Sequence, residues 1–434
     1  MDLTSRLRAI VNSGPPKALR ELTYEPDDGY RNAAALDGDY VASALGGRRV
    51  TNRFGECLVI DRRYESDRWH GRVQIGDCTI DDFDSLRILD PNLARSAGLE
   101  PCPRTIFIDL ETTGLSGGAG MVAFLVGCGY FDLGAFQVRQ FLLTSHAGER
   151  ALLAAVAEFF EGAALFVTYN GKTFDVPVME TRWLFHRMEM PSIGGEGGVP
   201  HFDMLHPARR LWKHDDSGCR LSTLERTLFD VVRVGDVPGM EIPARFYGFV
   251  RSGDPRPLEP VLEHNRIDLV SLAAVTARGI RMAREGHDGC RDCAEALALG
   301  KILERAEHFT RSEACYRFAA QSSASQVRAD ALYRLAVRLR RDRRFDAAAE
   351  TWRELIEFTE PRSMRRGQLN DCRQIAVEAL AIHREHRAKD LAGARELALA
   401  VLEESGSRAA KVRHRLARLD KKLSQKQNAQ LFSS

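Results

Sequence analysis

The segment Thr105-Ile-Phe-Ile-Asp-Leu-Glu-Thr-Thr-Gly-Leu115 is the most informative stretch of this chain. Its first residues are apolar and β-branched or aromatic, which is typical of a buried strand. Asp109 and Glu111 stand at positions i and i+2, so both carboxylates point to the same face of that strand. Like charges at close range raise each other's pKa, which favours a divalent cation beside the pair. The alternative is a strand that ends in solvent with incidental acids.

Strand and helix patterns alternate after this segment. We expect strands at residues 121–130, 136–143, 165–169 and 201–205, and helices at residues 149–160 and 176–188. The first strands follow one another directly, whereas the later ones alternate with helices. This order predicts an α/β domain over residues 101–285, in which helices flank a mixed β-sheet.

The N-terminal part has a different pattern. Over residues 1–100 we expect an arm that is loosely ordered from residue 4 to 39 and then a short β-hairpin. The hairpin strands are expected at residues 56–61 and 71–76, joined by a polar turn.

The C-terminal part, residues 286–434, is expected to be entirely helical. The residues Gly300, Phe309 and Ala314 recur as Ala336, Phe345 and Ala349, at an offset of 35 to 36 residues. This offset is close to the period of roughly 34 residues in tetratricopeptide (TPR) arrays. TPR-like helical pairs and an alanine-rich helical bundle both fit the pattern.

The composition sets only broad limits. The chain has 434 residues, 44% of them hydrophobic and 28% charged, which allows two or three domains. Its net charge of +2 does not by itself indicate a nucleic-acid partner. The first residues contain no apolar run long enough for a signal peptide, so none is expected, and no later window approaches the apolar length of a membrane span. The nine cysteines lack a disulfide-framework spacing. We therefore expect a cytoplasmic protein with no membrane partner.

Further acidic residues follow in other elements. Asp175 opens the helix after the segment Tyr169 to Phe174, where it is placed either as an N-cap or as a metal ligand. Asn170 and Lys172 of that segment add polar groups that can contact a phosphate.

His264 and Asp268 lie four residues apart and therefore share one face of a helix. Carboxylates on several elements suit two divalent ions, Mg²⁺ or Mn²⁺, in phosphodiester hydrolysis. A histidine near them can deprotonate the attacking water. A Walker A loop, a Rossmann glycine fingerprint and an HExxH motif are all missing from the sequence.

These motifs resemble those of a known group. The segments 107–114, 170–175 and 264–268 resemble, in order, the three motifs of the DEDD 3′→5′ exonuclease superfamily. More narrowly, residues 104–280 resemble the YprB-type RNase H-like domain, with the supporting segments 122–131, 203–212 and 221–225. The resemblance covers about two-fifths of the chain, and residues 55–64 also resemble a segment found upstream of that domain.

The resemblance implies an RNase H-like fold followed by the TPR-like helices. It also implies that Asp109, Glu111, Asp175 and Asp268 are metal ligands, with His264 as the base. One departure is the spacing of His264, which precedes Asp268 by four residues, whereas the histidine subgroup of these exonucleases uses five.

Other residues are expected to contact the nucleic acid or to have structural roles. Thr112, Asn170 and Lys172 are expected at the substrate, together with Arg209, Arg210 and Trp212. Trp212 also fits packing in the core. Asp203 is interpreted as a structural acid that binds nearby backbone, with a metal role as the alternative. Ser222 and Glu225 have the spacing of a helix capping box.

We therefore expect a metal-dependent nuclease, a DEDD-type exonuclease, that acts on the end of a DNA or RNA strand. Two alternatives remain: a nucleic-acid-binding protein with an RNase H-like fold and little catalysis, or a TPR-like scaffold. The C-terminal helices are a possible site for a protein partner.

Overall fold

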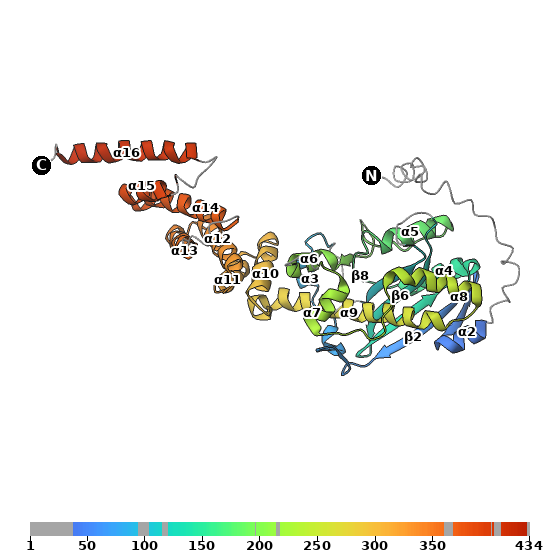
Figure 1. Cartoon of the computed structure of the whole chain (residues 1–434). Helices are drawn as coiled ribbons and strands as arrows, with labels where there is room; N and C mark the ends of the chain where they lie inside the picture. Colours follow the sequence, from blue (N-terminus) through green and yellow to red (C-terminus); the bar gives the residue numbers. More distant parts are fainter. Residues whose placement is uncertain are drawn as a thin grey trace.

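A sheet domain flanked by helices is followed by a series of helices that extends away from it (Figure 1). The structure is a computed structural model. It describes residues 38–93, 104–114, 120–195, 197–213, 218–359, 368–400, 402 and 409–431. The loosely ordered arm expected over residues 4–39 lies, except for its last two positions, outside the described residues.

Seven strands form one mixed sheet in the order β1-β2-β7-β6-β5-β8-β9. Their bounds are β1 Arg48–Asn52, β2 Gly55–Tyr64, β5 Thr105–Thr112, β6 Ala123–Asp132, β7 Ala135–Leu142, β8 Leu165–Thr168 and β9 His201–Asp203. Strands β5, β8 and β9 run parallel, and the other neighbours in the sheet are antiparallel. The predicted mixed sheet flanked by helices is confirmed.

The predicted N-terminal hairpin is wrong. Strand β2 pairs with β1 and, on its other side, with β7, where Leu58 lies opposite Leu142. The second expected strand contains only β4 (Val73–Gln74), which pairs with β3 (Trp69–His70). The apolar residues 57–60 of β2 are buried, so this strand is stabilised inside the large sheet and not in a local hairpin. Strands β1 and β2 thus belong to the same sheet as β5.

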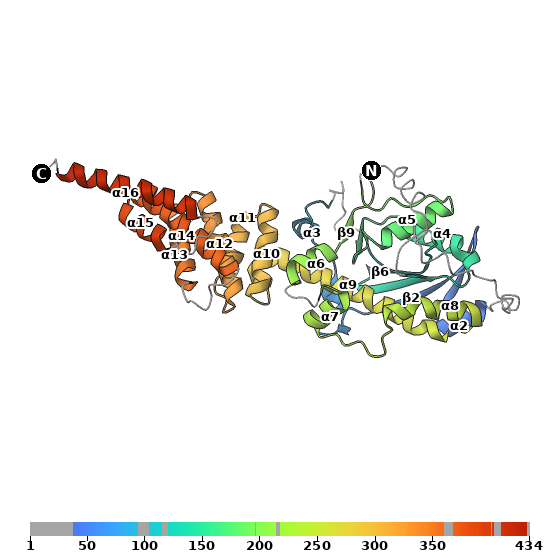
Figure 2. The same ribbon diagram turned by 45° about the horizontal axis from the view of Figure 1, so that its top comes forward.

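Eight helices accompany the sheet domain within the described residues. Their bounds are α2 Gly38–Leu45, α3 Phe83–Leu89, α4 Glu149–Phe160, α5 Asp175–Phe185, α6 Leu205–Trp212, α7 Leu221–Phe229, α8 Ile242–Ser252 and α9 Glu259–Glu285. Short 3₁₀ turns lie at Ile75–Cys78, His146–Gly148, Gly239–Glu241, Arg256–Leu258 and Gly286–Gly289. Figure 2 shows α9 running along the sheet and on toward the C-terminal helices.

Alternation along β5 separates two hydrophobic cores. Ile106 and Ile108 belong to a core that includes Leu152 and Val156 of α4. Phe107 lies between them and belongs to the second core. This core also contains residues 269, 270 and 272–275 of α9. Since side chains two residues apart share a face, the β5 residues that follow Phe107 at i+2 and i+4 face α9. This orientation positions the acidic pair.

The C-terminal region is helical, as predicted. Its helices are α10 Cys293–Arg305, α11 Phe309–Ala319, α12 Ser325–Arg341, α13 Phe345–Phe358, α14 Gln368–His383, α15 Leu391–Ala400 and α16 Ala409–Leu431, with a π-helical turn at Arg384–Ala388. Each of these helices packs against the next one along the chain. Phe309 and Phe345, which the sequence comparison aligned, each begin the second helix of a pair. The TPR-like assignment stays a prediction.

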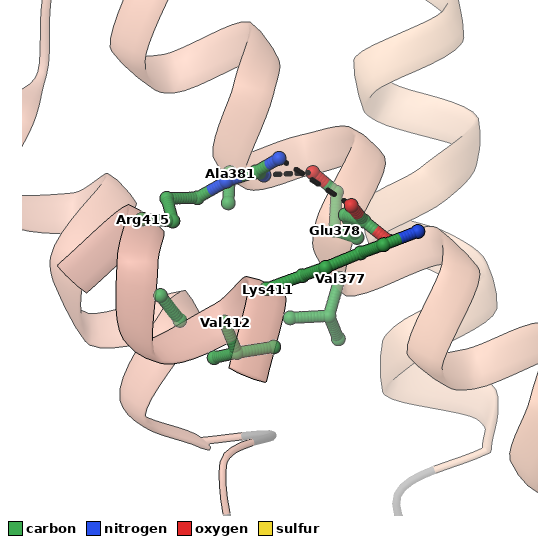
Figure 3. Close-up of a pocket in the computed structure, with 7 residues that line it drawn as sticks. Val377, Glu378, Ala381, Lys411, Val412 and Arg415 are labelled. Carbon is green, nitrogen blue, oxygen red and sulfur yellow. Dashed lines mark hydrogen bonds and ion pairs between the residues drawn. The ribbon is translucent and has the colours of Figure 1, made fainter. Parts of the chain in front are cut away.

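Polar contacts also hold the last helix in place. Arg415 of α16 donates to the carbonyl oxygen of Glu378 in α14 at 3.1 Å, beside a small apolar pocket lined by Val377, Ala381 and Val412 (Figure 3).

In the part of the chain that the structure describes, no helix combines the length and the apolar character that a membrane span needs.

Candidate active site

Strand β5 carries the first two candidate ligands. Asp109 lies opposite Gly127 of β6, and Glu111 lies opposite Leu125. Both acidic residues are half-buried and face α9. The pairing register shifts between Glu111 and Thr112, which marks a β-bulge at the end of the strand. The two carboxylates therefore emerge together where the strand leaves the sheet.

Asn265 of α9 is a site residue that the sequence interpretation missed. Its buried side-chain amide donates to Asp109 Oδ2 at 2.7 Å and to the Asp109 carbonyl oxygen at 3.1 Å. Its Oδ1 accepts from Gln140 Nε2 of β7 at 2.8 Å. Asn265 thus joins α9 to two strands and orients Asp109. A single asparagine on the buried side of a largely apolar helix was the available sequence signal.

Asp175 lies beside the β5 pair. It is the first residue of α5 and not its N-cap, and it is only 5% exposed. Burial raises its pKa to about 7, although backbone hydrogen bonds at Asp175 and at Leu110 act in the opposite direction. Because Leu110 separates Asp109 from Glu111 in β5, the Asp175 carboxylate adjoins both of them.

The acidic residues influence one another strongly. Burial raises the pKa of Asp109 and of Glu111 well above the ordinary range, and the charge of Asp268 raises both further. Asp175 contributes to both shifts as well. A group of partly or fully buried carboxylates that repel one another is stabilised by protonation or by a cation.

The donor set fits a hard divalent cation. The four predicted ligands supply carboxylate oxygens and no sulfur; they are Asp109, Glu111, Asp175 and Asp268. Carboxylate oxygens are the ligands that Mg²⁺ and Mn²⁺ prefer. In the described residues, however, no three His, Cys, Asp or Glu side chains are already arranged as a metal site. The fit therefore rests on the chemistry of the residues and on the raised pKa of Asp109, Glu111 and Asp175, and not on a preformed coordination shell.

Helix α9 places His264 and Asp268 on one side of the acidic group. The imidazole Nδ1 of His264 lies 2.7 Å from Asp236 Oδ1, and its Nε2 lies 3.6 Å from Asp268 Oδ2. Asp236 belongs to the loop after α7, and the sequence interpretation did not single it out. The pKa of Asp236 is lowered. Burial acts to raise this pKa, but the hydrogen bond with His264 acts to lower it. An ionised Asp236 thus holds one ring nitrogen and leaves the other directed toward Asp268.

Arg233, in the same loop, is a second missed residue. Its guanidinium donates to Asp268 Oδ1 and forms two hydrogen bonds with Glu225 of α7, at 2.5 and 2.8 Å. The capping-box prediction for Ser222 and Glu225 is wrong, since α7 has Arg220 as its N-cap and no side-chain cap. Glu225 is buried, and its carboxylate is satisfied there by hydrogen bonds from Arg233. The spacing of Ser222 and Glu225 in the sequence does not show this contact.

Asp203 at the end of β9 has the structural role that the sequence favoured. It is 1% exposed and accepts from the backbone N–H groups of Asn170 at 2.8 Å and Lys172 at 3.0 Å. It also accepts from the N–H of Leu205 at 3.1 Å. Asn170 has a φ of 72°, in the left-handed region, and these bonds stabilise that turn. Asp203 therefore shapes the loop that leads to Asp175.

The polar groups predicted to contact substrate differ in availability. The Thr112 hydroxyl is buried and donates to the Gly114 carbonyl oxygen at 2.7 Å. The side-chain oxygen of Asn170 accepts from Thr173, and Lys172 Nζ pairs with Asp90 at 3.0 Å. Asn170 and Lys172 remain exposed, so these two can meet a ligand, whereas Thr112 serves the local turn.

Helix α6 carries the other predicted contacts, and one of these predictions is wrong. Trp212 is buried, and its indole N–H donates to Glu295 of α10 at 2.9 Å, so it cannot stack on a base. Arg210 is exposed and donates to the Leu89 carbonyl oxygen. Arg209 is exposed and close enough to Tyr169, at the end of β8, to affect its pKa. Arg209 therefore lies near the residue that follows β8.

Comparisons with known proteins agree with this architecture. A family profile described as the RNase_H superfamily matches residues 106–278. The uncharacterized protein YprB of Bacillus subtilis (strain 168) is 32% identical over 327 residues, which cover 73% of this chain and 75% of that protein.

A solved structure of the family B DNA polymerase from the hyperthermophilic archaeon Pyrobaculum calidifontis is similar over 56% of this chain and 30% of that chain. The identity is 13% and the TM-score is 0.32. The profile match covers the strands and helices that hold the acidic residues, and the match to YprB extends over most of both proteins. The chain belongs to the family that includes YprB, and its residues 106–278 form a domain of the RNase_H superfamily.

Proposed function

We propose that this protein is a metal-dependent nuclease that hydrolyses phosphodiester bonds of DNA or RNA as a 3′→5′ exonuclease of the DEDD type. The observation that carries the proposal is the convergence of Asp109, Glu111, Asp175 and Asp268 from β5, α5 and α9, where the charges of Asp268 and Asp175 raise the pKa of Asp109 and of Glu111. Membership of the RNase_H superfamily supports nucleic acid as the substrate. The 3′→5′ polarity comes from the resemblance of the three motifs.

Four carboxylates would hold two divalent cations, Mg²⁺ or Mn²⁺: Asp109, Glu111, Asp175 and Asp268. Cations bound there supply Lewis acidity toward the scissile phosphate and lower the pKa of a water molecule. Asn265 holds one oxygen of Asp109, and Arg233 holds one oxygen of Asp268. The remaining oxygens of these two carboxylates are available as ligands.

His264 is proposed as the residue that accepts a proton from the attacking water. Its Nδ1–H donates to Asp236, which favours the tautomer with a free electron pair on Nε2. Nε2 faces Asp268 and so the acidic group. This arrangement of a histidine oriented by a carboxylate is one that general bases commonly use.

Exposed basic residues at the same edge of the sheet would bind the substrate backbone. Lys172 follows the carboxyl end of β8, and Arg209 lies in α6, which follows the carboxyl end of β9. Their charge suits phosphate contacts, which position a strand without reading its sequence. This matches an enzyme that acts on strand ends.

The test is a nuclease assay with purified full-length protein. Single- and double-stranded DNA and RNA, labelled at the 5′ end or at the 3′ end, are incubated with Mn²⁺, with Mg²⁺ or with EDTA. We expect a metal-dependent ladder from the 5′-labelled strand and early release of the label from the 3′-labelled strand. The double variant Asp109→Asn, Glu111→Gln removes both charges at nearly constant volume and is expected to abolish the ladder.

An exposed acid provides the matched control. Asp84 of α3 has a side chain that is 91% exposed, and Asp84→Asn should leave the activity unchanged. Binding of the labelled strands without cleavage by the wild type would instead support the RNase H-like binding protein. Neither binding nor cleavage would favour a scaffold role for the C-terminal helices.

A further inference from the structure

A buried chain of polar side chains connects Asp268 to the interior of the sheet domain. Asp268 accepts from Arg233, and Arg233 in turn donates to both carboxylate oxygens of Glu225. The side chain of Arg233 is 8% exposed and that of Glu225 is 2% exposed. The proposed reaction does not involve Glu225. Arg233 lies between Glu225 and Asp268 and bonds to both of them.

Glu225 is itself fixed from a second side. The hydroxyl of Ser271, one turn after Asp268 in α9, donates to Glu225 Oε2. His70 Nε2 of the small β3–β4 hairpin lies 2.9 Å from the same hydroxyl. Ser271 therefore holds Glu225 directly, His70 holds Ser271, and Glu225 holds Arg233. A network in which each member is bonded has a single stable arrangement.

The contact between Arg233 and Asp268 leaves one carboxylate oxygen unused. Arg233 bonds to Oδ1, whereas Oδ2 lies on the side of His264 Nε2, at 3.6 Å. Among the neighbouring charges, that of Asp268 contributes most to the raised pKa of Asp109 and of Glu111. Without the guanidinium, Asp268 would be a fourth carboxylate in a group that already repels itself.

We propose that Arg233 is a positioning residue, held by Glu225, that directs Asp268 Oδ2 toward the cation site and thereby sets the affinity for divalent cations. This inference rests on the proposed function. The loop after α7 supplies Arg233, so the site is completed by a segment outside the three recognised motifs. Partners that orient a ligand commonly change metal affinity by about 10- to 100-fold when they are removed.

Binding of Mn²⁺ to full-length protein, measured by calorimetry at fixed pH, tests the proposal without requiring turnover. We expect Arg233→Ala to weaken Mn²⁺ binding by about 10- to 100-fold. Arg233→Lys keeps the charge but cannot span Glu225 and Asp268, so it should restore only part of the affinity. Glu225→Gln should fall between the wild type and Arg233→Ala, because the guanidinium loses its charged anchor.

Arg278→Ala is the matched control for the loss of a buried ion pair. Arg278 lies on α9, ten residues after Asp268. It pairs with the buried Glu295 at 2.9 Å. Its loss should lower the melting temperature without changing Mn²⁺ affinity. Melting curves of all variants show whether each protein is folded, and Arg233→Lys and Glu225→Gln carry the test if Arg233→Ala is not.

The outcomes separate this inference from the proposed function. If the wild type binds Mn²⁺ no better than the Asp109→Asn, Glu111→Gln variant, the metal site itself is refuted and the inference with it. If the wild type binds Mn²⁺ and the folded Arg233 variants bind it equally well or more tightly, only the positioning role is refuted. Tighter binding would mean that the guanidinium competes with the cation.

Discussion

The side-chain amide of Asn265 donates to Asp109 Oδ2 at 2.7 Å, so a residue near the start of α9 determines how the first acid of β5 is directed. The helix approaches the sheet closely at this point. Gly127 of β6, which lies opposite Asp109, would bring a Cβ to 2.1 Å from Asn265 Oδ1. The orientation of Asp109 therefore depends on the absence of a side chain on the neighbouring strand.

Gly127→Ala tests this dependence. The new methyl group would displace the Asn265 amide from Asp109, and overpacking of this kind costs about 1–3 kcal/mol. We expect a lower free energy of unfolding in urea and a weaker affinity for Mn²⁺. Gly248→Ala in α8 is the control, because a Cβ there has no neighbour within 4 Å. Unchanged stability and metal affinity in Gly127→Ala would contradict the proposed close approach.

The raised pKa of Asp175 predicts a pH-dependent stability. The folded state holds the proton up to a pH of about 7 and the unfolded state loses it near the ordinary value of 3.8, so ionisation of this group destabilises the metal-free fold as the pH rises between these values. We expect the stability of Asp175→Asn relative to the wild type to increase from about pH 4 to about pH 7 in EDTA and to level off above that. Urea unfolding at several pH values measures the difference, and a difference that does not change with pH would refute the assignment.

Asp203 should matter for folding of the loop before Asp175. Asp203→Ala removes the acceptor of three backbone N–H groups, at Asn170, Lys172 and Leu205. Because buried donors that lose their partner cost about 1–3 kcal/mol each, we expect a loss of at least about 2 kcal/mol in urea unfolding. Asp203→Asn keeps one acceptor oxygen and should lose less. The interpretation fails if Asp203→Ala is as stable as the wild type.

Two residues of α6 should have opposite roles. Arg209→Ala removes an exposed charge, and we expect weaker single-strand binding with a salt dependence reduced by about one phosphate contact. Trp212→Phe removes the bond to Glu295 and should lower stability while leaving the affinity unchanged. Fluorescence anisotropy over a range of salt concentrations measures both. Loss of affinity in Trp212→Phe at constant stability would restore the stacking interpretation.

Much of the fold could be predicted because its signals are local. The apolar run of β5, the helical spacing of α4 and the order of strands and helices each depend on short stretches of chain. The bounds of α4 are those expected. In the same way, the period of two along a strand places Asp109 and Glu111 on one face without any knowledge of their neighbours.

Other features depend on partners that are distant in the sequence. Strand β2 could not be assigned to β7 because its pairing partner lies about 80 residues away, as between Leu58 and Leu142. For the same reason, Glu225 was interpreted as a capping residue, whereas the fold buries it against Arg233. A short motif does not show whether a polar group meets solvent or a buried partner.

The sequence by itself determined the mixed α/β architecture, the helical C-terminal region and the side of β5 on which the acidic pair lies, since these follow from residue periodicity. Only the tertiary structure decided which groups surround that pair. Asn265, Asp236 and Arg233 reach Asp109, His264 and Asp268 because α9 crosses the sheet and the loop after α7 folds onto it. Hydrogen bonds between segments are short-range in space but not in sequence, so the direction of each carboxylate is a property of the folded chain.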